Sequence, residues 1–197
     1  GELAKAELVL NQLPVRDTVS WNALISGHAQ LEQGIEVLEF FSKMQREGVS
    51  PDVVTFICVL KACGIVRDSD KGNQIHNEII SGRFLEKSVL LGSALVDMYA
   101  KCGVLEKARA VFNKLPFQDV NSWNALILGY AQHGQPKDAF TYFEIMQRDG
   151  YSPNVNTFVH ILKTCGDIGE VDKGKQIHNE IGSGGLLREN IMLGTAL

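Results

Sequence analysis

Apolar residues recur at the three- and four-residue spacing of an α-helix along most of the chain. Within residues 18–52 this spacing predicts a first helix around Trp21, Leu24, Ile25 and His28, and a second through Ile35, Val37, Leu38, Phe41 and Met44. The β-branched residues fall within the same helical period, and no Asn-Gly or Asp-Gly pair joins two alternating runs. The pattern therefore predicts an all-α fold built from helical hairpins.

The ends of the predicted helices carry typical cap residues. Ser20 is a candidate N-cap for the first helix, and Gly48, followed by Pro51, is a candidate stop for the second. The same signals return further along the chain, with Ser122, Thr55 and Thr157 in the capping place and Gly150 and Pro153 at the helix stop.

The chain repeats itself at an offset of 102 residues. DTVSWNALISGHAQ from Asp17 aligns with DVNSWNALILGYAQ from Asp119, and DKGNQIHNEI from Asp70 aligns with DKGKQIHNEI from Asp172. More than half of the aligned positions are identical. Weaker repeats lie inside this unit, with spacings of 35, 36 and 31 residues, which is the period of helical hairpin arrays.

These spacings divide the chain into seven segments: a partial short motif at 1–17, full motifs at 18–52, 53–88, 89–119, 120–154 and 155–190, and a partial short motif at 191–197. One hairpin cannot bury its apolar face alone, so neighbouring hairpins must stack into an α-solenoid with a shared core. Neither end carries a polar capping repeat, so we expect a fragment of a longer array.

Composition excludes several classes of protein. With 45% hydrophobic and 21% charged residues the chain is suited to a packed core rather than to disorder, and no apolar run approaches the length of a membrane span. Four cysteines without a C-x-x-C pair do not form a disulfide scaffold and favour a reducing compartment. The net charge of −4 argues at first against a nucleic-acid partner, which usually requires a basic excess.

Motif lengths of 35, 36 and 31 residues in that order, with SWNALI, LKACG, KGNQIH and LVDMYAKCG at fixed places, resemble the pentatricopeptide repeat (PPR) proteins of the land-plant PLS subclass. The tetratricopeptide repeat has a single 34-residue period and a different signature. The resemblance covers the whole chain. It implies a right-handed α-solenoid that recognises single-stranded RNA, one base per repeat.

In the family, the fifth and last residues of a motif choose the base. These pairs are here Asn22 with Asp52, Ile57 with Ser88, Ser93 with Asp119, Asn124 with Asn154, and Val159 with Asn190, followed by Thr195 of the last partial motif. The family code then implies a target of 5′-U-N-G-C/U-N-R-3′. Ile57 and Val159 lack side-chain hydrogen-bonding groups, so the long motifs 53–88 and 155–190 are expected to discriminate between bases weakly or not at all.

The resemblance also implies contacts to base faces and to phosphates. The second residue of each motif packs against a base, which assigns that role to Val19, Val54, Leu90, Asn121, Asn156 and Met192. Asparagine departs from the family's usual valine, and we expect it to bind the base less tightly. Three first-helix lysines are candidate phosphate contacts, each with solvation as the alternative: Lys61, Lys101 and Lys163.

Several conspicuous residues favour a structural interpretation. His76-Asn77-Glu78 and His178-Asn179-Glu180 match half of the zinc deaminase signature, but the P-C-x-x-C half is absent, so we expect second-helix residues without metal or catalysis. Trp21 and Trp123, which could stack on bases, are interpreted as hairpin core. Cys63 and Cys165 are expected to be small core residues.

The resemblance implies the recognition part of a mitochondrial or chloroplast factor for C-to-U RNA editing, with any deaminase domain outside this chain. No enzyme activity, cofactor or membrane partner is expected. Organellar editing accessory proteins are candidate partners through the long motifs. The alternative is an α-solenoid scaffold for protein partners. The acidic balance is compatible with RNA if the second helices, rich in residues such as Glu36 and Glu39, face outward.

Overall fold

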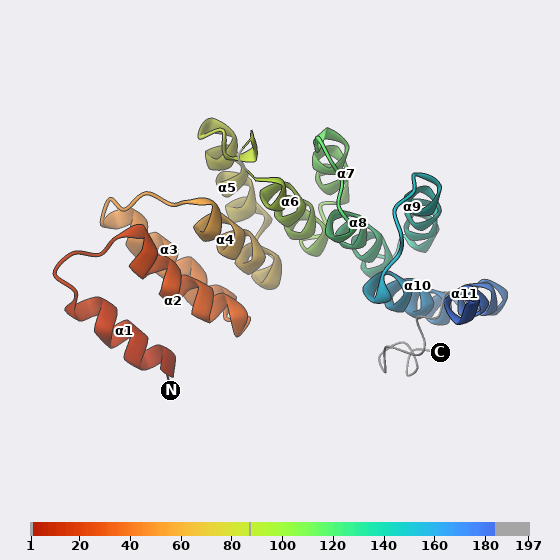
Figure 1. Ribbon diagram of the computed structural model, residues 1–197, viewed down its shortest axis with the longest axis horizontal. Coiled ribbons are helices and arrows are strands. Elements are labelled where there is room, and N and C mark those ends of the chain that lie inside the picture. Colours follow the sequence, from red (N-terminus) through yellow and green to blue (C-terminus); the bar gives the residue numbers. More distant parts are fainter. Residues whose placement is uncertain (1, 87, 184–197) are drawn as a thin grey trace. The chain divides into compact units, whose positions relative to one another are not determined.

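The computed structural model describes residues 2–86 and 88–183, and in these ranges the chain is all-helical. It divides into two compact units, residues 1–116 and 117–197. The helices are shown in order in Figure 1: α1 Glu2–Gln12, α2 Thr18–Gln30, α3 Gly34–Arg46, α4 Val53–Val66, α5 Ser69–Ser81, a 3₁₀ turn η1 Phe84–Glu86, α6 Val89–Lys101, α7 Leu105–Lys114, α8 Val120–Gln132, α9 Pro136–Arg148, α10 Val155–Ile168 and α11 Val171–Ser183. The prediction of an all-α fold made of hairpins is confirmed.

The first unit consists of α1 to α7. Each first helix packs on the second helix of its own hairpin, and the first helices α2, α4 and α6 also pack on one another in sequence order. Their apolar faces form one core, in which Ile25, Phe41, Leu60, Ile75 and Leu95 are fully buried. The predicted Ile35 is an exception, because it lies 64% exposed on the outer face of α3 while Phe40 takes the inward position.

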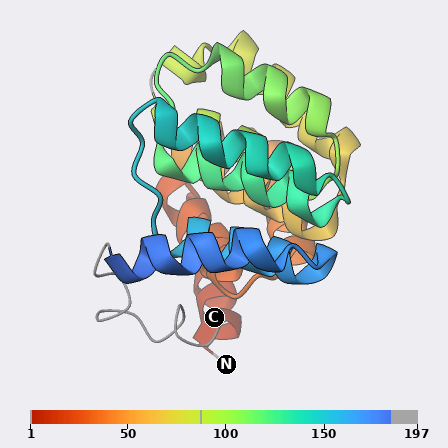
Figure 2. The same cartoon turned by 90° about the vertical axis from the view of Figure 1, so that its right-hand side faces the viewer.

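The second unit repeats this arrangement with α8 to α11. The hairpin partners α8 and α9 lie side by side, as Figure 2 shows, and α8 packs on α10. Trp123, Leu126, Phe143, Met146 and Phe158 are buried in its core. None of the helices in the described ranges is both long and apolar enough to cross a membrane.

Each first helix begins at the first residue of a predicted motif. The helices α2, α4, α6, α8 and α10 start at Thr18, Val53, Val89, Val120 and Val155. The second helices α3 and α9 end before Gly48 and Gly150, whose φ angles of 73° and 84° are accessible to glycine at little cost. The predicted helix stops are thereby confirmed.

Candidate functional site

The start of the first helices is fixed by reciprocal side-chain capping. At α4, Asp52 Oδ1 accepts the backbone N–H of Thr55 at 2.9 Å, and Thr55 Oγ1 accepts the backbone N–H of Asp52 at 3.1 Å. The same capping box pairs Asp17 with Ser20, Asp119 with Ser122, and Asn154 with Thr157. The last residue of one motif is therefore the N-cap of the next motif's first helix.

This geometry corrects the predicted caps. Ser20, Thr55, Ser122 and Thr157 occupy the third position of the capping box, while the N-cap is the acid or amide three residues earlier. A short hydroxyl at the third helical position reaches back to the cap backbone, and the longer carboxylate or amide reaches forward to the exposed helical N–H groups.

One predicted pair, Asn22 and Asp52, meets through the cap of α4. Asn22 Nδ2 donates to Asp52 Oδ1 at 2.9 Å, and Thr55 Oγ1 donates to Asn22 Oδ1 at 2.6 Å. Asn22 is only 9% exposed, so its amide is held in one orientation by partners on both sides. The arrangement thus places Asn22 beside Asp52, the partner that the family resemblance gives it.

The second unit builds the same network with an amide in place of the acid. Asn124 Nδ2 donates to Asn154 Oδ1 at 3.1 Å, and Thr157 Oγ1 donates to Asn124 Oδ1 at 2.6 Å. Asn124 is 8% exposed. Because Oδ1 of each cap residue already accepts a backbone N–H, it must face the amide nitrogen of the buried asparagine, which leaves the amide oxygen toward the threonine hydroxyl.

The two networks differ in the one atom that they leave available. The capping and pairing bonds of both networks use Oδ1, and Asp52 Oδ2 and Asn154 Nδ2 take no part in them. Burial tends to raise the pKa of the Asp52 carboxyl, but hydrogen bonds from Thr55 and Asn22 outweigh it and hold the pKa below its ordinary value. At neutral pH the available atom is therefore an acceptor at Asp52 and a donor at Asn154.

The second residue of every described motif is exposed at the start of its first helix. Val19, Val54 and Leu90 are 74%, 48% and 59% exposed, although each is apolar. Asn121 and Asn156 are exposed at the equivalent places in the second unit. Each lies three residues before the fifth position, so it is adjacent to that residue on the helix surface.

The remaining predicted base-specifying residues lie in different surroundings. Ser93 is 7% exposed in α6 of the first unit, and Asp119 caps α8 of the second unit. Ser88 is the N-cap of α6 but forms no side-chain capping bond, and Ile57 and Val159 are half-buried on α4 and α10. The predicted residues Asn190, Met192 and Thr195 lie outside the described residues.

The three candidate phosphate lysines are not equivalent. Lys61 Nζ donates to the backbone carbonyl of Ala29 at 3.1 Å, and Lys101 Nζ pairs with Asp97 at 2.7 Å. Lys163 is exposed on α10 and has no hydrogen bond or ion pair within the described ranges. Lys163 is accordingly the one of the three that can meet an anion without giving up a partner.

The residues expected to be structural are mostly buried or paired. Trp21 and Trp123 are 2% and 3% exposed, and Cys63 and Cys165 are 0% and 4% exposed, which confirms their assignment to the core. Burial raises the pKa of the Cys63 thiol to about 12. His76 and His178 lie on the second helices α5 and α11, as predicted.

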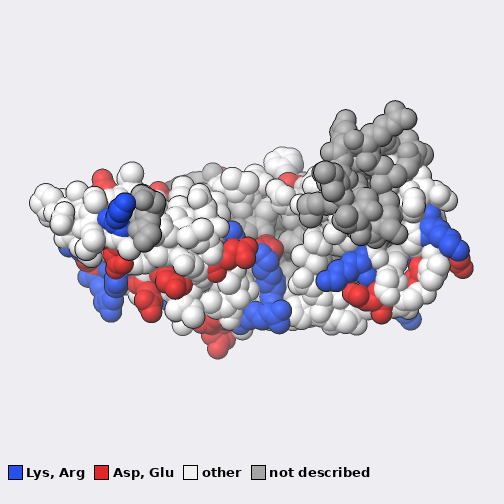
Figure 3. All heavy atoms as spheres, turned by 90° about the horizontal axis from the view of Figure 1, so that it is seen from below, with Lys and Arg blue, Asp and Glu red and all other residues white. Residues whose placement is uncertain are grey.

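Among the residues described, no three His, Cys, Asp or Glu side chains come together as metal ligands. On the face shown in Figure 3, the acidic and basic side chains of the described residues are interspersed rather than gathered into a basic stripe. An anionic polymer would therefore meet separate lysines on this face.

Thr55 and Thr157 are members of the two networks, although the sequence pattern predicts them only as capping residues. Each follows its asparagine by 33 residues, Asn22 with Thr55 and Asn124 with Thr157. The recurrence of both residues at the 102-residue offset is the signal that links them in the sequence.

Comparison with known proteins gives consistent matches. Sequence models described as "PPR repeat family" and "PPR repeat" match residues 16–64 and 118–167, and residues 93–118, respectively. The chain is 39% identical over 183 residues to the pentatricopeptide repeat-containing protein At5g27110 of Arabidopsis thaliana, covering 93% of the chain and 26% of that protein. It is 41% identical over 173 residues to At4g18520, chloroplastic, of the same plant, covering 88% of the chain and 28% of that relative. It is 40% identical over 156 residues to At3g02330, mitochondrial, also of this plant, covering 79% of the chain and 17% of that relative. The chain thus spans about a quarter or less of these relatives.

Two solved structures share the fold. The pentatricopeptide repeat protein PPR10, in complex with an 18-nt psaJ RNA element, superposes with a TM-score of 0.79 at 21% identity over 94% of the chain and 28% of PPR10. The PPR domain of Arabidopsis thaliana protein-only RNase P 1, in complex with tRNA, gives a TM-score of 0.60 at 14% identity over 84% of the chain and 88% of that domain.

Proposed function

Because the chain belongs to the PPR repeat family, we propose that it binds single-stranded RNA and reads one base per motif. The observation that carries the proposal is the pair of networks Asn22–Asp52–Thr55 and Asn124–Asn154–Thr157. Each holds a buried amide rigidly and leaves one hydrogen-bonding atom of the neighbouring cap residue available. Groups fixed in this way lose little conformational entropy when a base binds.

The available atoms account for different base preferences at the two motifs. Uracil carries an N3–H donor, which suits the ionised Asp52 carboxylate, whereas cytosine carries an unprotonated N3 acceptor, which suits Asn154 Nδ2. A carboxylate facing cytosine N3 would place two acceptors together, and this costs affinity because neither is satisfied. Motif 18–52 therefore reads uracil, and motif 120–154 reads cytosine with some uracil.

The exposed second residues provide the base-face contact. An apolar side chain left 48–74% exposed at Val19, Val54 and Leu90 costs burial free energy unless a ligand covers it. A base lying on such a side chain gains stacking and dispersion energy, worth roughly 1–3 kcal/mol for good aromatic platforms and less for aliphatic ones. Asn121 and Asn156 offer less apolar area, so the second unit binds its bases less tightly.

The rest of the assignment follows the family. Ser93 with Asp119 reads guanine, whose N1–H is a donor, and Thr195 reads a purine. Ile57 and Val159 contribute no base-specific hydrogen bond, so the target is 5′-U-N-G-C/U-N-R-3′. The protein acts as the target-recognition part of an organellar C-to-U editing factor, in a mitochondrion or chloroplast, as suits relatives named chloroplastic and mitochondrial. Deamination is assigned to a domain outside these residues or to a separate protein.

A second candidate function is a scaffold for protein partners. It is favoured by the half-buried apolar side chains of Ile57 and Val159, which occupy base-specifying places without being able to specify a base. Editing accessory proteins that bind at these long motifs, 53–88 and 155–190, would make the two functions compatible.

The decisive experiment is a binding titration of the 197-residue chain with six-nucleotide RNAs. We expect the U-N-G-C/U-N-R pattern to bind more tightly than a scrambled RNA of the same composition. Equal affinity for the two RNAs would contradict base reading and would favour the scaffold function. Mass spectrometry of the RNA after incubation should detect no deaminated product, and any conversion of C to U would overturn the assignment of recognition alone.

A further inference from the structure

A pocket of about 660 Å³ opens in the first unit between α5, η1, α6 and α7. Its apolar lining includes Ile80, Leu85, Val111 and Leu115. The linker from α5 to α6 includes η1 and is longer than the linker from α3 to α4, and α5 packs on α6 less extensively than α3 packs on α4. This looser junction creates the space. Its volume lies in the range of small-molecule sites.

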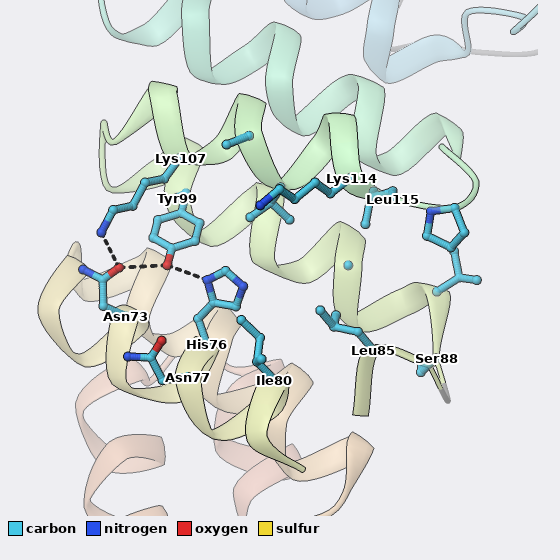
Figure 4. Close-up of a pocket in the computed structure, with 15 residues that line it drawn as sticks. Asn73, His76, Asn77, Ile80, Leu85, Ser88, Tyr99, Lys107, Lys114 and Leu115 are labelled. Atoms are coloured by element: carbon cyan, nitrogen blue, oxygen red, sulfur yellow. Dashed lines mark hydrogen bonds between the residues drawn. The ribbon is translucent and has the colours of Figure 1, made fainter. Parts of the chain in front are cut away.

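One wall of the pocket carries a fixed chain of polar groups, which Figure 4 shows. Tyr99 donates its hydroxyl proton to Asn73 Oδ1 at 2.8 Å, and Lys107 Nζ donates to the same oxygen at 2.7 Å. Because the ammonium group can only donate, the acceptor must be the amide oxygen of Asn73. The Tyr99 oxygen in turn accepts from His76 Nδ1, also at 2.8 Å.

The charge of the lining is positive. Two lysines, Lys107 and Lys114, are among the 15 lining residues, and no aspartate or glutamate is. Lys114 has no hydrogen bond or ion pair with any residue that the structure describes, and its side chain lies between Tyr99 and Leu115 in Figure 4. Burial, followed by the charges of Lys107 and Lys114, lowers the pKa of His76. The lining of the pocket is thus positively charged, whereas the whole chain has a net charge of −4.

From this combination we infer that the pocket is a binding site for a small organic anion with an apolar body. The anionic group pairs with Lys114 and reaches the polar wall at Lys107, while the body packs on Ile80, Leu85 and Val111. The exposed ammonium of Lys114, which lines the pocket, gains a charge-assisted bond when an anion binds there. The mixture of a large apolar lining with a few convergent polar groups is typical of ligand sites.

The pocket lies apart from the residues proposed to specify a base by hydrogen bonding, and the one predicted pair member that lines it, Ser88, belongs to a long motif expected to read weakly or not at all. Its walls are the second helices α5 and α7 and the turn η1, with Val89, Gly92 and Tyr99 of α6 between them. Val54 and Asn22, in contrast, lie near the starts of the first helices α4 and α2. A ligand in the pocket can therefore be detected independently of RNA.

The test uses a matched pair of fluorescent probes on the 197-residue chain. 8-Anilinonaphthalene-1-sulfonate is an apolar aromatic anion, and N-phenyl-1-naphthylamine has the same aromatic body without the charge. We expect saturable binding of one equivalent of the sulfonate and its displacement by octanoate but not by octanamide. Displacement by an uncharged, end-blocked leucine peptide with no effect of octanoate would assign the pocket to a protein segment and overturn the proposal.

Two variants locate the probe. Lys114→Met should weaken the sulfonate roughly tenfold, the effect of losing one charge-assisted bond, and leave the neutral probe unchanged. Ala110→Trp, which fills the pocket mouth from α7, should weaken both probes. Lys137→Met removes an exposed lysine from α9 of the other unit and serves as the charge control.

Thermal unfolding of each variant checks that the native fold remains, since the sulfonate also binds loosened cores. An unsaturable wild-type signal, or equal effects of Lys114→Met and Lys137→Met, would overturn the inference.

Discussion

At the scale of single residues, the feature that matters most is the fixed orientation of two buried amides. Asn22 and Asn124 each accept a threonine hydroxyl on one side and donate to a cap residue on the other. A free asparagine could present either its oxygen or its nitrogen to a base. The cap network removes that choice, so under the proposed function discrimination depends on Thr55 and Thr157 as well as on the residues that face the RNA.

The available atom of the cap residue can be exchanged without removing the cap. In Asp52→Asn we expect the preference at the first base to move from uracil toward cytosine, because an acceptor is replaced by a donor. Asn154→Asp should move the fourth base from cytosine toward uracil. Titration with RNAs differing only at these bases measures both shifts, and each variant is the control for the other site. An unchanged preference in both would refute the proposed role of the cap atom.

The threonine hydroxyls can be removed with little change of shape. Thr55→Val should reduce discrimination at the first base several-fold and lower stability by about 1–2 kcal/mol, because the buried Asn22 oxygen loses its donor. Thr157→Val should have the same effects at the fourth base only. Competition binding with single-base RNA variants and urea unfolding provide the measurements. Loss of stability with intact base discrimination would limit the hydroxyls to a structural role.

At the scale of helices and hairpins, much could be predicted from the sequence. The 102-residue repeat and the spacings inside it located the starts of α4, α6, α8 and α10, because equivalent hairpins need equivalent signals. The Gly48 and Gly150 stops were predictable because the left-handed backbone favours glycine. The capping residue was misassigned because serine, threonine, aspartate and asparagine all cap well, and only geometry decides between neighbours in a capping box.

The candidate site was predictable only in part. Pairing of Asn22 with Asp52 came from the family resemblance, whereas the third partner, Thr55, had no separate signal in a single motif. The pocket between α5 and α7 was not predictable from the pattern at all. It arises where two elements fail to fill space, which depends on side-chain geometry across several helices rather than on any local period.

The cap of α4 should make part of the stability depend on pH. The pKa of Asp52 is lowered in the folded state, so its contribution is present above its unfolded pKa, near 3.9, and is lost as pH falls through the lower folded pKa. Asparagine caps a helix about as well but does not titrate in this range.

We therefore expect the wild-type chain to lose more stability than Asp52→Asn between about pH 4.5 and pH 2. Urea unfolding at several pH values measures the difference, and all other carboxylates are common to both proteins. Parallel curves for the two proteins would contradict the contribution of Asp52.

The contact between α3 and α4 has no space for a larger residue at Gly34. A Cβ there would lie 2.9 Å from Val66 Cγ1 and 3.1 Å from the backbone carbonyl oxygen of Ala62. We expect Gly34→Ala to lower the free energy of unfolding by about 1–3 kcal/mol, as overpacking usually does. Gly166→Ala is a suitable control, because its Cβ would meet nothing within 4 Å. Equal stability of the two variants in urea unfolding would show that the α3–α4 contact adapts.

At the scale of the whole molecule, the net charge of −4 limits how the proposed RNA ligand can be held. Each phosphate contact on a single strand contributes roughly −0.7 to the slope of log K against log salt. With three candidate lysines, this slope should be no steeper than about −2. Lys163→Ala should reduce the slope by roughly 0.7, whereas Lys61→Ala and Lys101→Ala should reduce it less, because these lysines already have partners. Titrations from 50 to 200 mM salt, an ordinary working range, provide the measurement. A much steeper slope would show that phosphates are contacted by further cations.

The capping boxes constrain how such an array can change its target over evolutionary time. Asp52, Asp119 and Asn154 each cap a helix as well as end a motif. A mutation at these positions therefore changes the stability of the fold as well as any contact with a ligand. Exchanges among Asp, Asn and Ser keep a good cap and are nearly neutral for stability, whereas most other residues cost about 1 kcal/mol per motif. If the cap residues choose the bases as proposed, new specificities are reached through a small set of cap residues, and the array can change one base of its target at a time without unfolding.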